Sequence, residues 1–216
     1  MVSKTFDKLT SQERLEMYKC RTEFMFEALD IIEKYGGKPW LDCGTLLGAY
    51  RDGAYIPWDN DIDLGIKIED VNEDMLTELR NTFNVRLENG TLAKNKFAAY
   101  YKKDKNGKNF KYKRCNFWFD LYIYYPGNDG YRTMTVTIHK VKEPTKIYPV
   151  PAHCVETLQQ IDWYGRRCYI PSSTEDYLKQ WYGESWRTPD KTWTVSPNWY
   201  ERGVDNKDPN KNNKPF

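Results

Sequence analysis

The sequence lacks the marks of several protein classes. It has only two histidines among 216 residues, and its five cysteines are odd in number with no CxxC pair. Zinc sites need clustered Cys and His ligands and disulfide frameworks need paired cysteines, so we expect neither, and a reducing compartment fits. There is no long apolar run, and the mean hydropathy is −0.85, which argues against a transmembrane segment. The N-terminus has no apolar segment typical of a signal peptide.

An excess of either charge is also absent. The chain carries 33 basic and 31 acidic residues, for a net charge of +2. Proteins that coat nucleic acid are usually strongly basic on one face, so we do not expect a nucleic-acid partner.

Aromatic residues are abundant. The 8 Trp, 17 Tyr and 9 Phe supply enough apolar surface for a globular core. The length favours one domain, which we place at residues 1–204. Residues 205–216 (DNKDPNKNNKPF) are polar and predict a disordered tail.

Three segments have helical patterns. Thr10–Tyr35 begins with a possible capping box and ends at Gly36-Gly37, and its expected inward side chains are Leu15, Tyr18, Thr22, Met25, Leu29 and Ile32. Glu69–Phe83 is predicted as a second helix, and Ser172–Tyr182, with Ser172 as N-cap, as a third.

Strands are expected between these helices. We predict strands at Trp40–Cys43, Asp61–Ile66, Phe117–Tyr125 and Tyr131–His139, with a short helix or turn at 44–51. The Asn-Gly pair in residues 104–108 indicates a hairpin. Residues 94–114 hold nine Lys or Arg and one Asp, which indicates either a solvated hairpin or, near its base, contact with an anionic substrate.

Carboxylates gather on one predicted strand. In an extended chain Asp61 and Asp63 point to the same face, while Ile62, Leu64 and Ile66 point to the other. Two parallel carboxylates repel each other, and a divalent cation such as Mg²⁺ or Mn²⁺ relieves the repulsion. Asp120, within an aromatic strand, is the candidate third ligand. The alternatives are a solvated acidic turn and an Asp bonded to backbone at a strand end.

Candidate phosphate-binding residues precede this strand. Gly44 and Thr45 follow a short strand and open a turn whose amides could bind an anion, and Arg51 could grip a phosphate. The alternatives are an ordinary strand-to-helix turn and an ion pair of Arg51 with Asp52 or Asp59. Trp58 is expected either to wedge its loop in place or to stack on a base.

The string GTLLGAYRDGAYIPWDNDIDLGI resembles the signature of the LicD and fukutin family of the nucleotidyltransferase superfamily. FDLYIY resembles the second acidic strand of that family, and IDWYGRRCYIP with DYLKQWYGESWRTP resembles its closing segment. The resemblance covers roughly residues 41–189 with gaps. It implies an α/β (α+β) fold, with a mixed β-sheet flanked by helices, a β-hairpin insertion and a C-terminal helical segment.

The resemblance also implies site roles. Asp61 and Asp63 would bind metal with Asp120, and Asp59 matches the first acid of the family's WDxDxD string. The implied reaction moves phosphocholine or a polyol phosphate from a CDP-activated donor to a glycan hydroxyl, as in the modification of lipopolysaccharide or teichoic acid, and releases CMP. The implied setting is cytoplasmic, with peripheral association with a membrane.

Two other functions stay open. One is a nucleotidyltransferase that moves NMP from an NTP and releases pyrophosphate, and the other is a non-catalytic glycan- or phosphate-binding relic. A choline cargo would need an aromatic cage, for which Trp118, Tyr122 and Tyr124 share the face of Asp120; core packing is the alternative.

Overall fold

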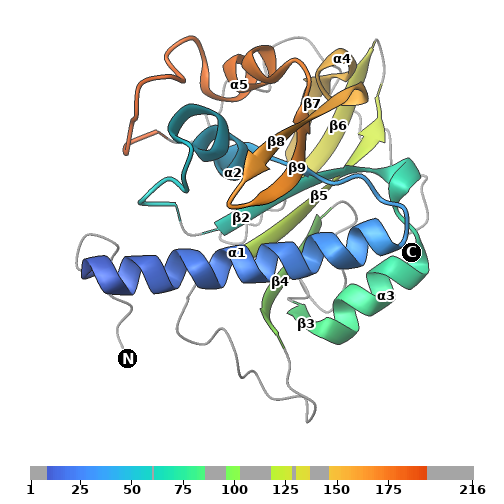
Figure 1. The fold of residues 1–216 in the computed structure, drawn as a ribbon. Coiled ribbons are helices and arrows are strands. Elements are labelled where there is room, and N and C mark those ends of the chain that lie inside the picture. Colours follow the sequence, from blue (N-terminus) through green and yellow to red (C-terminus); the bar gives the residue numbers. More distant parts are fainter. Residues whose placement is uncertain are drawn as a thin grey trace.

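A mixed β-sheet with helices on both faces forms the molecule (Figure 1). The computed structural model describes residues 9–59, 61–85, 96–102, 118–127, 130–136 and 146–193. Within these ranges nine strands join in one sheet, whose main path runs β3-β4-β5-β2-β1-β9-β8, with β6 and β7 extending from β5. The strands are β1 (Trp40–Leu41), β2 (Asp61–Lys67), β3 (Phe83–Val85), β4 (Lys96–Lys102), β5 (Trp118–Pro126), β6 (Tyr131–Val136), β7 (Lys146–Pro151), β8 (Leu158–Trp163) and β9 (Arg166–Pro171). The predicted α/β architecture is therefore confirmed.

Helix α1 (Ser11–Lys34) crosses one face of the sheet (Figure 1). Its start confirms the predicted capping box, because the Thr10 hydroxyl accepts the Glu13 N–H and the Glu13 carboxylate accepts the Thr10 N–H. Phe24, Met25, Ala28, Leu29 and Ile32 are buried along its inner side. Leu15 was predicted to face inward, but it is 62% exposed because the helix extends past the core at that end.

At the centre of the sheet, one face is apolar and the other carries polar side chains. Strands β2 and β5 are parallel, with Ile62 paired to Phe119 and Asp63 to Asp120. Phe119 packs against Phe24 of α1 at a ring-centroid distance of 5.5 Å. Side chains alternate along a strand, so the aspartates point away from α1. On their side lie α2 (Cys43–Leu47) and α5 (Thr174–Tyr182).

The second helix begins later than predicted. Ile68–Asp70 forms the 3-10 turn η3, and α3 (Glu73–Thr82) starts after Asn72, whose side chain accepts the Met75 N–H. An Asn cap satisfies an amide that would otherwise lack a partner, and it fixes this start. Met75, Leu76 and Leu79 are buried on the inner side of α3, and Val71, which precedes the helix, is partly buried.

Several predictions past residue 100 met different outcomes. Strand β5 was predicted correctly, while β7, α4 (Ala152–Glu156), β8 and β9 were not predicted as elements. Helix α5 starts at Thr174 rather than after Ser172. The Thr174 hydroxyl donates to the Pro171 carbonyl. Gly183 ends the helix with φ of 79°, as expected for a C-cap glycine. The hairpin tip at 104–108 and the tail at 205–216 lie outside the described residues.

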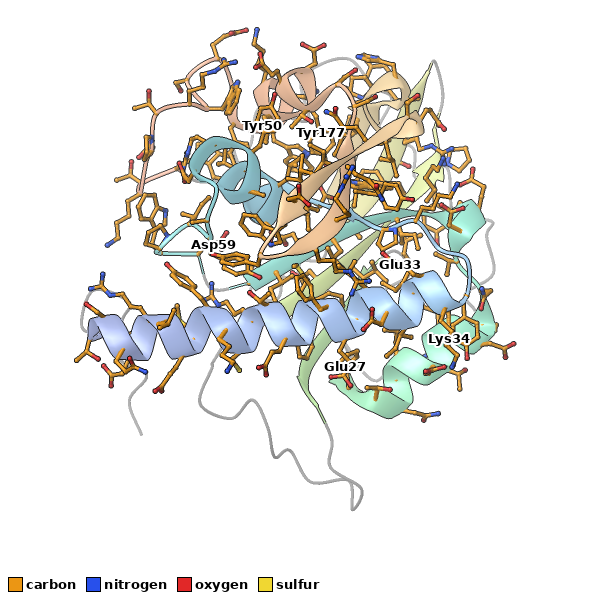
Figure 2. The ribbon with its side chains drawn as sticks, viewed as in Figure 1. Glu27, Glu33, Lys34, Tyr50, Asp59 and Tyr177 are labelled. Carbon is orange, nitrogen blue, oxygen red and sulfur yellow. The ribbon has the colours of Figure 1, made fainter. Side chains whose placement is uncertain are left out.

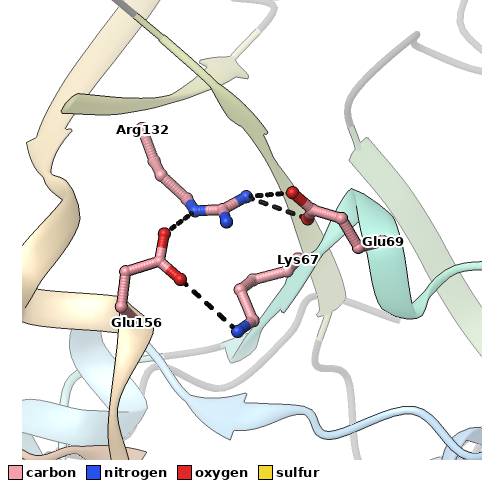
Figure 3. A network of polar contacts seen from close by, with 4 residues as sticks. All are labelled: Lys67, Glu69, Arg132 and Glu156. Atoms are coloured by element: carbon pink, nitrogen blue, oxygen red, sulfur yellow. Dashed lines mark hydrogen bonds and ion pairs between the residues drawn. The ribbon is translucent and has the colours of Figure 1, made fainter. Parts of the chain in front are cut away.

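The far end of β2 is tied to neighbouring elements by charged side chains (Figure 3). Arg132, 8% exposed, donates from Nε to Glu156 at 2.6 Å and from one terminal nitrogen to Glu69 at 2.9 Å. Lys67 of β2 lies 3.6 Å from the same Glu156 carboxylate. The network holds β2 by its end at Lys67, opposite the end that carries Asp61 and Asp63.

One cysteine prediction requires correction. Cys20 is disulfide-bonded, while Cys43, Cys154 and Cys168 are free thiols. Disulfides are rare in reducing compartments, so the cysteines no longer support the cytoplasmic expectation. Within the described ranges, each helix is too short or too polar to cross a membrane.

Candidate active site

The turn that joins β1 to α2, residues 42–45, holds one aspartate by three hydrogen bonds. The Asp42 N–H donates to the Asp63 carbonyl at 3.0 Å, and the Asp63 N–H donates to the Thr45 hydroxyl at 2.9 Å. The Gly44 N–H donates to Asp63 Oδ2 at 3.2 Å. Backbone and side chain of Asp63 are both fixed, so its carboxylate has little freedom to turn away from its neighbours.

Those neighbours are two more aspartates. One carboxylate oxygen from each of Asp59, Asp61 and Asp63 lies within 4.8 Å of the others. In Figure 2, Asp59 lies on the loop that leads into β2. Asp120 is not in this group, although strand register places it beside Asp63. Its carboxylate accepts a hydrogen bond from the Tyr122 hydroxyl at 3.3 Å.

Gly44 makes the group possible by lacking a side chain. A Cβ atom at this position would collide with Asp59 Oδ2 and would also come 3.5 Å from Asp63 Oδ2. The turn can therefore approach the Asp59 carboxylate this closely only because residue 44 is glycine.

The electrostatics of the group favour a cation. Burial raises the pKa of Asp63 well above its usual value, and the charges of Asp61, Asp59, Asp120 and Asp42 raise it further. Asp63 is only 4% exposed, so water screens this repulsion poorly. Three converging carboxylates match the hard oxygen ligands that Mg²⁺ and Mn²⁺ prefer, so the residues present fit such an ion.

A cavity of about 340 Å³ opens beside the carboxylates. Asp59, Asp61, Asp63, Gly44 and Arg51 line one part of it. Aromatic side chains line much of the remainder: Trp58, Tyr122, Trp181, Tyr182, Trp186 and Trp193. The cavity thus combines a place for a cation with broad apolar surfaces for an organic group.

The turn that was predicted to bind phosphate makes hydrogen bonds within the protein. The Gly44 amide is already bonded to Asp63, and the Cys43 amide donates to Asp42 Oδ1 at 2.8 Å. Thr45 is 2% exposed, and its hydroxyl holds the Asp63 backbone rather than facing the cavity. The anion that this turn attracts is a carboxylate of the protein itself.

Arg51 forms an ion pair and also lines the cavity. It lies on the π-helical turn η2 (Gly48–Asp52) and lines the cavity. It also forms the ion pair with Asp52 that was the alternative, through two bonds of 2.7 Å, and donates to the Trp186 carbonyl at 3.3 Å. These bonds fix the guanidinium at the cavity wall.

The aromatic candidates separate into distinct groups. Trp58 is 38% exposed, lines the cavity and has no ring partner within the described ranges. Tyr122 also lines the cavity. Tyr124 is fully buried and belongs to the core, and the Trp118 side chain is outside the described part.

Comparisons with known proteins decide the family. A family model described as the LicD/FKTN/FKRP nucleotidyltransferase domain matches residues 36–173. The chain therefore belongs to the LicD/FKTN/FKRP family. The matched range includes all four candidate aspartates and ends just before α5.

Named relatives give the family context. The chain is 27% identical to human "Ribitol-5-phosphate transferase FKTN" over 181 residues, 84% of this chain and 36% of that protein. It is 30% identical to human "Ribitol 5-phosphate transferase FKRP" over 156 residues, 71% of this chain and 29% of that protein. The chain thus spans about a third of the length of these relatives.

A solved structure shows a more distant likeness. The lincomycin-bound lincosamide antibiotic adenylyltransferase LnuA aligns with a TM-score of 0.42 and 15% identity, over 79% of this chain and 84% of that one. A likeness of this size carries no argument about the LicD/FKTN/FKRP chain.

Two charged residues of this family member were missed in the sequence. Asp42 is fully buried and accepts hydroxyl hydrogen bonds from Tyr124 and Tyr177. Arg21 of α1 is 2% exposed and interacts electrostatically with Asp59 and Asp61. Its position on the apolar side of a predicted helix, three residues after Tyr18, was the available signal for Arg21. Asp42 gave no such signal, because its partners lie 82 and 135 residues away.

Gly44→Ala is expected to weaken Mn²⁺ binding by about tenfold or more, because the added methyl displaces Asp59 from the carboxylate group. Alanine is about 1 kcal/mol more favourable than glycine within a helix, so a general loss of helix stability is not expected. Titration of Mn²⁺ by electron paramagnetic resonance measures the change. Wild-type affinity in the variant would show that Asp59 is not a ligand.

Mn²⁺ affinity is expected to rise with pH. The raised pKa of Asp63 means that a proton competes with the cation over a range that begins above the ordinary carboxyl value. In that range the ionised group destabilises the metal-free fold, so stability falls as pH rises, and bound Mn²⁺ reverses this loss. We expect affinity at about pH 8 to exceed that at about pH 5 by at least about tenfold. Calorimetric titration at both pH values tests this, and equal affinities would contradict it.

Proposed function

We propose that this chain is a metal-dependent transferase that moves a phospho-alcohol from a CDP-activated donor to a hydroxyl group, most simply of a glycan, and releases CMP. The observation that carries the proposal is the group of three carboxylates at the cavity, in a chain of the LicD/FKTN/FKRP family. The names of two relatives as ribitol-phosphate transferases support the choice of reaction.

The carboxylates would hold the metal. Asp61 and Asp63, with Asp59, would bind Mg²⁺ or Mn²⁺, which when bound supplies positive charge to the non-bridging oxygens of the donor diphosphate. Asp120 would hold the acceptor side of the site. Arg51, which also lines the cavity, would bind the diphosphate in addition to its pairing with Asp52.

The chemistry is an in-line displacement. The acceptor hydroxyl oxygen forms a bond to the phosphorus that carries the alcohol, and the bond from that phosphorus to the bridging oxygen of CDP breaks. The hydroxyl proton goes to Asp120, whose carboxylate also accepts a hydrogen bond from the Tyr122 hydroxyl, and CMP leaves with the bonding pair. Arg51 would stabilise the charge that collects on the departing phosphate.

The cargo has two candidates within this class. The relatives favour a polyol phosphate such as ribitol phosphate. The aromatic lining, with Trp58 exposed at the cavity, would also suit the quaternary ammonium of phosphocholine. The two cargoes are distinguished by the donor that binds.

A donor panel tests the proposal. Purified protein with Mn²⁺ or Mg²⁺ is mixed with CDP-ribitol, CDP-glycerol, CDP-choline, CTP or ATP, and the melting temperature is recorded, because a ligand of the folded state raises it. We expect a cytidine diphosphate donor to stabilise the protein and to yield CMP. Stabilisation by an NTP alone, with release of pyrophosphate, would instead identify a nucleotidyltransferase.

Variants show whether the carboxylates perform the reaction. Asp61→Asn and Asp63→Asn are expected to lower kcat by about 100-fold or more while the fold persists. Asp74→Asn is the matched control, because Asp74 is an exposed acid on α3, across the sheet from the cavity. Donor binding without turnover in the wild-type protein, unaffected by the variants, would indicate a binding relic.

A further inference from the structure

Asp42 occupies a fully buried position between three elements of the site. Its Oδ2 accepts the Tyr124 hydroxyl of β5 at 2.8 Å, and its Oδ1 accepts the Tyr177 hydroxyl of α5. The two tyrosine oxygens lie 2.8 Å apart. Figure 2 labels Tyr177 on α5. Hydrogen bonds to a charged or partly charged group in a dry interior are strong and directional, so this cluster fixes distances between the elements.

The backbone of the same turn holds a candidate metal ligand. The Asp42 amide bonds the Asp63 carbonyl, and the next residues, Gly44 and Thr45, bond the Asp63 side chain and amide. The main chain of Asp42 is therefore hydrogen-bonded to Asp63, and its side chain is hydrogen-bonded to α5 through Tyr177.

Helix α5 in turn carries part of the cavity wall. Trp181 and Tyr182, four and five residues after Tyr177, line the cavity, and so do Trp186 and Trp193 in the segment that follows Gly183. The Tyr182 ring lies 4.6 Å from that of Trp193, centroid to centroid. A shift of α5 would move the surfaces that face a bound donor.

We propose that Asp42 is a positioning residue that couples the carboxylate group to the aromatic wall, through Tyr177, so that a cation at the carboxylates and an organic ligand at the wall bind cooperatively. The coupling rests on the proposed function, because it takes the carboxylates to be a metal site. By thermodynamic linkage, each ligand must favour the other by the same factor.

Tyr177→Phe isolates the link. It removes one hydroxyl and leaves the ring in the core, so the turn can still hold Asp63 while its bond to α5 is gone. Tyr124→Phe is the comparison variant, because it removes the bond from β5 to the same carboxylate and the 2.8 Å contact between the two hydroxyls, but leaves the direct bond between Tyr177 and Asp42 in place.

Hydrogen exchange with Mn²⁺ as the only ligand measures the coupling. Bound Mn²⁺ slows exchange everywhere by stabilising the fold, so amides of α3 serve as the internal reference. In wild-type protein and Tyr124→Phe, Mn²⁺ slows α5 amides about tenfold more than α3 amides. In Tyr177→Phe, Mn²⁺ slows the exchange of α5 and α3 amides equally, and the Mn²⁺ affinity is unchanged.

Turnover gives a second readout with the active donor. Tyr177→Phe raises the donor KM about tenfold with a smaller effect on kcat, because the wall contacts the donor before and during the reaction. A purely structural tyrosine would lower the melting temperature and leave KM as it is.

The outcomes separate the two proposals. Mn²⁺ binding that slows α5 no more than α3 in wild-type protein, or equally in wild type and Tyr177→Phe, overturns the coupling and leaves the proposed function standing. A wild-type protein that binds no Mn²⁺ overturns both.

Discussion

The site depends on the hydrogen bonds by which residues 42–45 fix Asp63. Carboxylates brought this close repel one another, and burial removes the water that would screen them. Free side chains would separate. Asp63 cannot, because its amide, carbonyl and carboxylate are all bonded to the turn. The strain of the metal-free group is thus retained in the fold and would be released when a cation binds.

The surrounding elements hold β2 and its aspartates in place. The parallel pairing of β2 with β5 presents acids on one face and gives the other face to the core beneath α1. The network of Arg132, Glu156 and Lys67 fixes the opposite end of β2 (Figure 3). Arg21 adds a buried positive charge near Asp59 and Asp61, which offsets part of the repulsion without occupying the cavity lining. Rigid supports of this kind allow a site to be organised before its ligand arrives.

Local signals in the sequence predicted the parts that local physics determines. The Thr10–Glu13 capping box and the alternation along Asp61–Ile66 were both visible, since each depends on residues a few positions apart. The contacts of Asp42 were not visible, because they join positions separated by 82 and 135 residues. Gly44 and Thr45 were singled out as phosphate-binding residues, whereas their bonds to the Asp63 carboxylate and amide were not predicted. Strands β7 to β9 were not predicted, and each is held by pairing with a neighbouring strand, which depends on tertiary context more than on local composition.

A crystal soaked in Mn²⁺ and measured for anomalous scattering tests the central claim most directly. The account predicts a peak at the carboxylates, with oxygens of Asp61 and Asp63 at about 2.0–2.3 Å from the ion. Carboxylates that point apart around an empty centre, with no anomalous peak among them, would contradict it.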